Sequence, residues 1–207
     1  MSKYFLLLAC FIVPLIGFSQ PAGYQPLSQS EQNVYMQSIK KASRELTSLQ
    51  TDFVQEKQSV IFSEIVKSTG KMYYQSPSSL RWEYKTPSQM ILAGNAQNII
   101  LKNEQGSTMA PKMVKDLVKM MLNMVNGQSL ADTVNFSAKY YQGTHILVQL
   151  SPKSKRMKDM YKSVEVYIGK KDFLAEKVVL YEANGDITTI RFSNKTVNLV
   201  LKKDLFQ

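Results

Sequence analysis

Apolar and polar side chains alternate along most of this chain, and the alternation predicts a structure built mainly from β-strands. The clearest case surrounds the only tryptophan, where Leu80, Trp82 and Tyr84 alternate with charged residues, the period of a half-buried strand. Pro77 and Pro87 frame this run, and they mark its ends because proline cannot donate to the hydrogen-bond ladder of a sheet. The large apolar side chains of this strand must pack a core or line a cavity.

Further strands are predicted by the same pattern. Their approximate ranges are 53–60, 65–74, 89–93, 98–102, 135–141, 145–150, 163–168, 174–181, 188–192 and 197–201. The dipeptides Gly94-Asn95 and Asn184-Gly185 are typical of tight turns. Because few helices separate these strands, the sheet should be antiparallel, and roughly ten strands would curve on themselves.

A first helix is predicted from about residue 30 to 49. Ser28 and Glu31 have the spacing of a capping box, which marks a helix start. Apolar residues then recur every three or four positions, with charged residues between them: Ile39, Ala42, Leu46, Leu49 and Phe53. This amphipathic pattern predicts a helix that lays one face on the sheet.

A second helix is predicted between Met109 and Asn126, and it is rich in methionine. Its apolar face carries Met113, Leu117, Met120, Met121 and Met124, and five of the eleven methionines of the chain lie in this segment. Thioether side chains are flexible and adapt to apolar ligands of variable shape, although such a stripe more often packs a core. Because the helix follows strands with large aromatic side chains, it suits a lid over a hydrophobic hollow.

The N-terminus reads as an export signal. Lys3 precedes fifteen mostly apolar residues, 4–18, which are too few and too interrupted for a membrane-spanning helix. We expect residues 1–20 to be a signal peptide cleaved near Gln20 and residues 21–207 to form a single domain; the alternative is an uncleaved anchor. Cleavage would also remove Cys10, the only cysteine, so the mature protein would need neither a disulfide nor a thiol.

The chain is strongly basic. It has 26 Lys and Arg against 16 Asp and Glu, and loss of Lys3 with the signal would leave a net charge of about +9. Such a surface favours anionic partners, of which nucleic acid is the least favoured for an exported protein. Two basic clusters stand out, and each is either a solvated face or a docking site for anionic lipid or an acidic receptor: Lys153, Lys155, Arg156, Lys158 and Lys162, and Lys112, Lys115 and Lys119.

Catalytic chemistry has little support in the sequence. His145 is the only histidine and lies in an alternating strand, where a satisfied or surface imidazole is the favoured interpretation. Motifs for a serine nucleophile, a zinc protease or a phosphate-binding loop are absent from the sequence. The pairs Asp52 with Glu56 and Asp159 with Glu165 could help to hold a metal, but such pairs are common by chance. We therefore predict a protein that is not an enzyme, with no metal and no cofactor.

The segment Gly70–Pro87, G-K-M-Y-Y-Q-S-P-S-S-L-R-W-E-Y-K-T-P, resembles the signature of the LolA family. Residues 49–57 are similar to the first strand of that family, with its F-x-Q core at Phe53 and Gln55. Ile91-Leu92 follows at the expected interval, and residues 192–206 resemble the closing strands. The motifs are individually degenerate, but their order and spacing extend the resemblance over nearly all of the mature chain.

The resemblance implies an α+β fold, namely a strongly curved, unclosed antiparallel β-barrel with an α-helical lid over an apolar cavity. It also implies a monomeric periplasmic carrier that shields the acyl chains of lipoproteins on their way from the inner to the outer membrane. Its partners would be an inner-membrane release transporter and an outer-membrane acceptor. The expected lipid-binding residues are Phe53, Leu80, Trp82, Ile91, Met113, Leu117, Met120, Met121 and Met124.

Two departures from the family pattern leave other functions open. Many members place Arg before the first proline of the signature, where it helps to hold the lid shut; Ser76 stands there in this chain, so the closing contact should be weaker or made elsewhere. The chain also stops at Gln207, without the tail that some members carry. The alternatives are a carrier of another acylated or polyene-type lipid, and a periplasmic sensor or scaffold that binds a partner protein.

Overall fold

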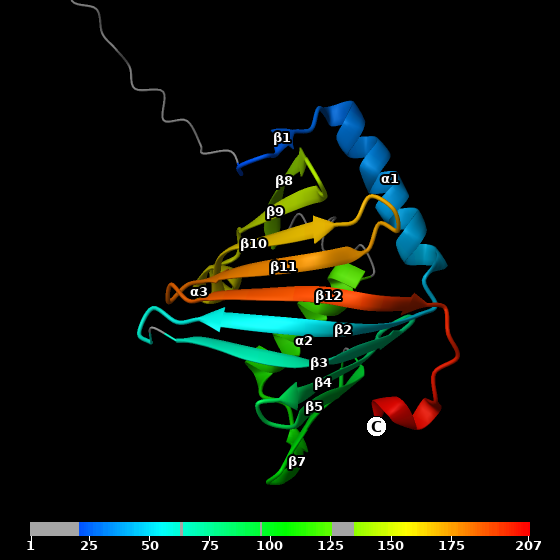
Figure 1. Ribbon diagram of the computed structural model, residues 1–207, viewed down its shortest axis with the longest axis vertical. Helices are drawn as coiled ribbons and strands as arrows, with labels where there is room; N and C mark the ends of the chain where they lie inside the picture. The colour runs from blue at the N-terminus through cyan, green and yellow to red at the C-terminus, as the bar shows by residue number, and fades with distance from the viewer. Residues whose placement is uncertain (1–20, 63, 96, 126–134) are drawn as a thin grey trace, which may run out of the picture.

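A single sheet of twelve antiparallel strands curves through the protein (Figure 1). The computed structural model describes residues 21–62, 64–95, 97–125 and 135–207, without the side chains of Met113, Leu117, Met124 and Lys203. The expected signal peptide, residues 1–20, lies outside the described residues. Within the described part of the chain, no helix has both the length and the apolarity needed to cross a bilayer.

The strands follow one another in space in the order β1-β8-β9-β10-β11-β12-β2-β3-β4-β5-β6-β7. Their bounds are β1 (Gln25–Pro26), β2 (Ser48–Gln58), β3 (Ile65–Gln75), β4 (Ser79–Thr86), β5 (Met90–Asn95), β6 (Ile99–Asn103), β7 (Gly106–Met109), β8 (Phe136–Gln142), β9 (Ile146–Pro152), β10 (Tyr161–Ile168), β11 (Ala175–Glu182) and β12 (Ile187–Val197). Strands β1 and β7 are the two edges of this order, so the curved sheet stays open. The predicted unclosed, antiparallel half-barrel is confirmed.

The two halves of the sheet join at the pair β2 and β12, which are far apart in the sequence. Phe53 on β2 lies opposite Phe192 on β12 at the centre of this pair. On the other side of β2, Phe53 lies opposite Gly70 of β3. Two phenylalanine residues therefore meet in the middle of the sheet rather than at an edge.

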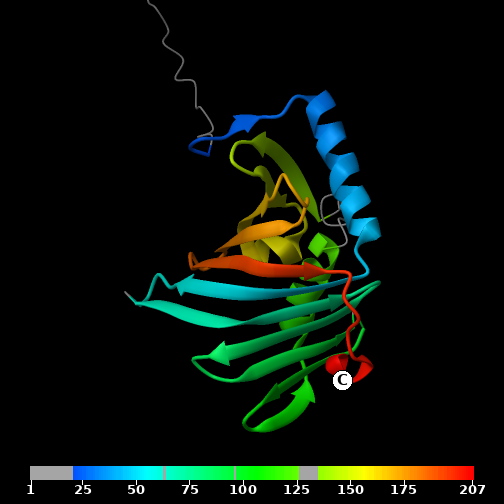
Figure 2. The same cartoon turned by 45° about the vertical axis from the view of Figure 1, so that its right-hand side comes forward.

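Among the residues that the structure describes, two long helices and two short ones accompany the sheet. They are α1 (Gln29–Glu45), α2 (Lys112–Val125), α3 (Lys155–Met160) and the 3₁₀ helix η2 (Lys203–Phe206). Helix α2 lies inside the curve of the sheet, and α1 runs along one end of the strands (Figure 2). The capping box of Ser28 and Glu31 is confirmed, with both reciprocal hydrogen bonds present.

The first helix ends earlier than the sequence predicted. Helix α1 stops at Glu45, and Leu49 belongs to β2 rather than to the apolar stripe of the helix. The reason is that Leu49, Thr51 and Phe53 alternate on the inner face of β2, and all three are buried there. Packing of these side chains into the sheet outweighs the helical spacing of the same residues.

The end of the chain also differs from the prediction. The two strands expected at 188–192 and 197–201 are one strand, β12, which ends at Val197. Val200 is fully exposed while Leu199 and Leu201 are half-buried, and the left-handed Asn198, with a φ of +58°, turns the chain away from the strand direction directly after β12. The sequence missed β1, β7 and α3 because they are too short to show a period. The two missed strands, β1 and β7, account for the excess over ten strands.

The core consists of two clusters, one on each side of the β2–β12 pair. The first, here called the Trp82 cluster, packs the inner faces of β2 to β6 against Val118 and Leu122 of α2. In it the Phe53 ring stacks on Trp82 with centroids 4.2 Å apart. The second, the Ile146 cluster, packs β8 to β11 against Ile39 of α1 and Met120 of α2. Helix α2 therefore touches both clusters.

Gly70 leaves room for this aromatic stack. A Cβ added at Gly70 would lie 2.0 Å from the carbonyl oxygen of Glu83 and 2.6 Å from the ring of Phe53. We expect Gly70→Ala to lower the free energy of unfolding by about 1–3 kcal/mol, because the ring and the neighbouring strand must shift. Urea denaturation measures the change, with the exposed Lys67→Ala as the control; equal midpoints for both variants would contradict this packing.

Candidate functional site

An apolar hollow lies at the seam between the two core clusters. Its floor comes from the inner faces of β2, β3, β10, β11 and β12, whose alternation turns every second side chain inward. Helices α1 and α2 cover it, with Ile39 from α1 and Met120 and Met121 from α2. The hollow thus lies where the open sheet curves most closely around its helices.

Almost all of the residues around the hollow are apolar. Besides the three helical residues already named, the apolar lining consists of Leu49, Met72, Val125, Val166, Ile168, Phe173, Leu174, Ala175, Val178, Leu180, Ile190 and Phe192. The polar residues are Ser43, Thr51 and Lys195. Thr51 is itself satisfied, because its hydroxyl donates to the carbonyl of Ser193 at 2.7 Å. Such a lining suits hydrocarbon and offers little to a polar ligand.

The hollow encloses about 70 Å³ in this arrangement. That is room for a few water molecules, whereas pockets that hold drug-sized ligands measure roughly 300–1,000 Å³. A hydrocarbon chain can therefore enter only if a covering element moves away from the sheet.

Lys195, the one cation among the described residues that line the hollow, is paired with carboxylates. The Nζ atom of Lys195 lies 2.6 Å from Oδ2 of Asp172 and 3.8 Å from Oε1 of Glu176. In the core beside the hollow, burial raises the pKa of the Tyr84 phenol, which donates a hydrogen bond to Oε1 of Gln55 at 2.9 Å. The indole N–H of Trp82 approaches that phenol and tempers the rise, but it makes no hydrogen bond of good geometry within the described residues.

Helix α2 is held over the hollow mainly by apolar contacts. The side chains of Val118, Met120 and Leu122, which belong to α2, are buried against the sheet. An ion pair joins Asp116 of α2 to Arg156 of α3. Ser76, which stands where many family members have Arg, donates its backbone N–H to the carbonyl of Thr47 at 2.9 Å. The Asp116–Arg156 ion pair thus connects α2 to α3, whereas Ser76 lies on the other half of the sheet.

The sequence-predicted lipid-binding residues occupy several places. Met120 and Met121 line the hollow. Phe53, Leu80 and Trp82 lie on the same inner face but are packed inside the Trp82 cluster, with at most 2% of their surface exposed. Ile91 lies opposite Glu83 and therefore on the outer face of the sheet, while its neighbour Leu92 pairs with Trp82. Met113, Leu117 and Met124 belong to α2, but their side chains lie outside the described residues.

Sequence reasoning missed the lining that comes from α1 and from β10 to β12. These residues lie in the predicted strands 163–168 and 174–181, where Val166 shares a strand face with Ile168 and Val178 shares one with Leu180. The alternation could not show which part of such a face lies under the helices. That information depends on the joining of β12 to β2, which no local pattern records.

Both ring nitrogens of His145 have hydrogen-bond partners, and its side chain does not line the hollow. Its Nε2 lies 3.1 Å from Oε2 of Glu176, and its Nδ1 lies 3.2 Å from the hydroxyl of Tyr24. Three of the four carboxylates considered as metal ligands have other partners: Asp52 lies 2.9 Å from Nζ of Lys71, Glu56 lies 2.6 Å from the guanidinium of Arg191, and Glu165 accepts a hydrogen bond from the hydroxyl of Tyr167 at 2.8 Å. In the described residues no cluster of three potential metal ligands occurs.

The fold is an open β half-barrel, and its helices cover an apolar space on the inner face of the sheet. Residues 44–207 match the family model described as outer membrane lipoprotein carrier protein LolA, and the chain belongs to this family. Its members are carriers or binding proteins rather than enzymes.

Similar proteins were found by sequence and by structure. An outer-membrane lipoprotein carrier protein from Nitrosomonas europaea is 23% identical over 177 residues, which cover 83% of each chain. The MucA/MucB complex of Pseudomonas aeruginosa contains a similar fold, with a TM-score of 0.51 and 13% identity over 86% of this chain and 60% of that chain. A LolA superfamily protein from Nitrosomonas europaea has a TM-score of 0.45 and 10% identity, over 83% of this chain and 97% of that chain.

Proposed function

We propose that this protein is a periplasmic carrier that shields the acyl chains of lipoproteins during transfer from the inner to the outer membrane. The observation that carries the proposal is the apolar hollow under α1 and α2, with Met120 and Met121 in its roof. Family membership supports the same conclusion. The carrier acts as a monomer of one domain, residues 21–207, after removal of the signal peptide.

Burial of hydrocarbon alone supplies enough free energy for such a carrier. Each methylene that leaves water contributes about 0.8 kcal/mol, so an acyl chain of a dozen carbons gains on the order of 10 kcal/mol gross. Moving a helix away from the sheet and ordering the chain offset part of that gain. The remainder is small enough for an acceptor with a comparably apolar site to take the cargo without any reaction.

Helix α2 is the element that we propose moves. Apolar contacts carry no directional preference, so the Met120 and Met121 side chains can exchange contact with the sheet for contact with hydrocarbon. In the Asp116–Arg156 ion pair the arginine is half exposed, whereas only 15% of the aspartate side chain is, so a movement of α2 must break this pair or carry α3 along. The inner-membrane release transporter and the outer-membrane acceptor would each bias this equilibrium by their own contacts with the carrier.

The carrier function predicts a soluble complex that depends on the lipid of the cargo. Purified protein mixed with an acylated lipoprotein should keep it soluble after detergent removal, and the two should coelute in gel filtration. The same lipoprotein with its lipidated cysteine replaced by serine is the control and should elute alone. Equal binding of both forms would contradict an acyl-chain carrier and would favour a partner-binding scaffold.

Mass spectrometry of material copurified from the periplasm then separates the possible cargoes. Acylated protein supports the proposal. Free lipid alone would replace it by a carrier of another lipid, and a protein complex without any apolar ligand would replace it by a sensor or scaffold. The lipid headgroup and chain length come from the same spectrum.

A further inference from the structure

The turn between β2 and β3 exposes several large apolar side chains. Val60, Ile61 and Phe62 follow β2 with 64%, 81% and 69% of their surface exposed, and Ile65 and Val66 at the start of β3 are 59% and 56% exposed. We call these five residues the hairpin tip. Contiguous exposed apolar residues of this kind mark a surface that meets another apolar phase, because leaving them in water is unfavourable.

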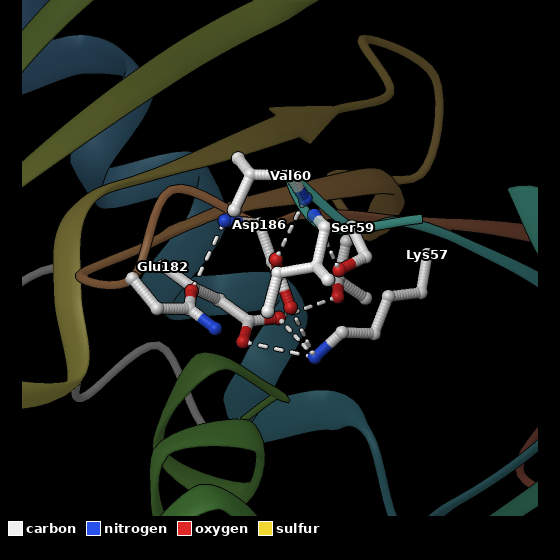
Figure 3. A network of polar contacts seen from close by, with 8 residues as sticks. Lys57, Ser59, Val60, Glu182 and Asp186 are labelled. Atoms are coloured by element: carbon white, nitrogen blue, oxygen red, sulfur yellow. Dashed lines mark hydrogen bonds and ion pairs between the residues drawn. The ribbon is translucent and has the colours of Figure 1, made fainter. Parts of the chain in front are cut away.

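The hairpin tip is anchored rather than loose. The backbone N–H of Val60 donates to Oδ1 of Asp186 at 3.0 Å, and Lys57 lies 3.2 Å from Asp186 and 3.1 Å from Glu182. Figure 3 shows the Lys57 ammonium facing both carboxylates beneath Val60. The Val60 N–H and Lys57 hold the pKa of Asp186 below its usual range, so the carboxylate stays charged at neutral pH. Thr188 completes the network by donating to Glu182 at 2.7 Å.

The turn of β11 and β12 supports the root of the tip closely. Gly185 in this turn has a φ of +98°, and a Cβ added there would lie 2.9 Å from Cγ1 of Val60. The exposed tip is thus presented on a fixed base, which lowers the entropy cost of inserting it into another phase.

A basic segment lies at the same end of the half-barrel. The carbonyl of Met160, at the end of α3, accepts a hydrogen bond from the N–H of Ala183 in the β11–β12 turn at 3.0 Å. Figure 1 shows α3, this turn and the hairpin tip together on the left of the view. Residues 153–162 carry five exposed basic side chains and one acidic one: Lys153, Lys155, Arg156, Lys158 and Lys162, and Asp159.

We propose that the hairpin tip and the basic segment of residues 153–162 dock this protein on the surface of an anionic lipid bilayer. The apolar tip enters the boundary between headgroups and acyl chains, and the basic side chains lie over the phosphates. Aliphatic and aromatic side chains next to Lys and Arg are the combination that binds anionic membranes. An acidic protein would match the basic segment but would leave the apolar tip in water. This docking is independent of cargo in the hollow.

Vesicle flotation tests the docking. The wild-type protein should bind vesicles of phosphatidylcholine that contain about one third phosphatidylglycerol, and should bind pure phosphatidylcholine weakly. The affinity of the double variant Ile61→Ser/Phe62→Ser for the anionic vesicles should be lower than that of the wild type by a factor of about ten or more. The matched control is Val34→Ser/Val200→Ser, which removes two exposed apolar side chains elsewhere and should bind like the wild type.

Two further variants separate the explanations. Replacing Lys155, Lys158 and Lys162 by Gln should weaken binding and reduce its salt dependence. Met121→Glu, which changes the hollow, should bind the vesicles like the wild type. The docking is wrong if the wild type ignores anionic vesicles, or if the Ile61→Ser/Phe62→Ser variant, folded by circular dichroism, floats as well as the wild type. If the wild type does not bind anionic vesicles, the basic segment either binds an acidic protein or is simply solvated.

Discussion

Replacing Met121 by glutamate is expected to weaken the binding of an acyl chain by about 100-fold or more, while the protein stays folded. Met121 lines the hollow and is only partly buried, so the new carboxylate can reach water in the empty protein. An acyl chain in the hollow would cover that carboxylate and strip its water. The cost of burying an unpaired charge then cancels much of the gain from the hydrocarbon.

A fluorescent fatty-acyl probe measures the effect on Met121→Glu directly. Lys119→Glu is the matched control, because it places the same side chain on the exposed face of the same helix. The control should bind the probe with nearly the affinity of the wild type. If Met121→Glu also kept that affinity, the acyl chain would not lie in the hollow under α2.

Removing the indole of Trp82 is expected to lower the free energy of unfolding by about 3–5 kcal/mol, a large part of the stability of a typical domain. Trp82 is 2% exposed, stacks on Phe53 and meets the ring of Phe192 edge-on with centroids 6.0 Å apart. The cavity left by Trp82→Ala cannot close, because strands on both sides fix its walls.

Urea denaturation followed by circular dichroism tests this, since the variant has no tryptophan left to report by fluorescence. Ile91→Ala is the control: Ile91 lies on the outer face of the neighbouring strand, and its loss should cost about 1 kcal/mol or less. Leu80, at 1% exposure, belongs to the same packed group, so Leu80→Glu and Trp82→Glu should unfold the protein rather than selectively remove ligand binding. A folded Leu80→Glu protein would show that this packing opens readily.

Much of the fold could be predicted because its strands bury one face each. The alternation around Trp82 and the turn at Asn184-Gly185 both survive in the structure, where β4 spans Ser79–Thr86 and the N–H of Gly185 donates to the carbonyl of Glu182. Such features are local, and residues close in sequence determine them. The same reasoning extended α1 too far, because Leu49 satisfies both a helical and a strand period.

The site was harder to predict than the fold, because the hollow is formed by distant segments. Met120 and Met121 could be proposed from their helical spacing, but nothing near Ile190 or Val166 indicates that these side chains lie beneath α2. Conversely, Leu80 and Trp82 show the alternation of a lining strand, yet neighbouring rings fill the space beside them. Periodicity identifies the inner face of a strand and leaves open whether that face meets a void or other side chains.

The most direct measurement of the central claim uses Trp82 as the reporter of the hollow. Phe192 lines the hollow and contacts Trp82, so an acyl chain that enters beneath α2 must come close to the indole. The probe is a fatty-acyl chain brominated along its length and added as a monomer. It should quench the tryptophan fluorescence of the wild type saturably, with one chain per protein. Over the same concentration range it should leave the fluorescence of Met121→Glu unchanged. Absence of saturable quenching in the wild type, when the same chains bind, would place the hydrocarbon elsewhere and contradict the account.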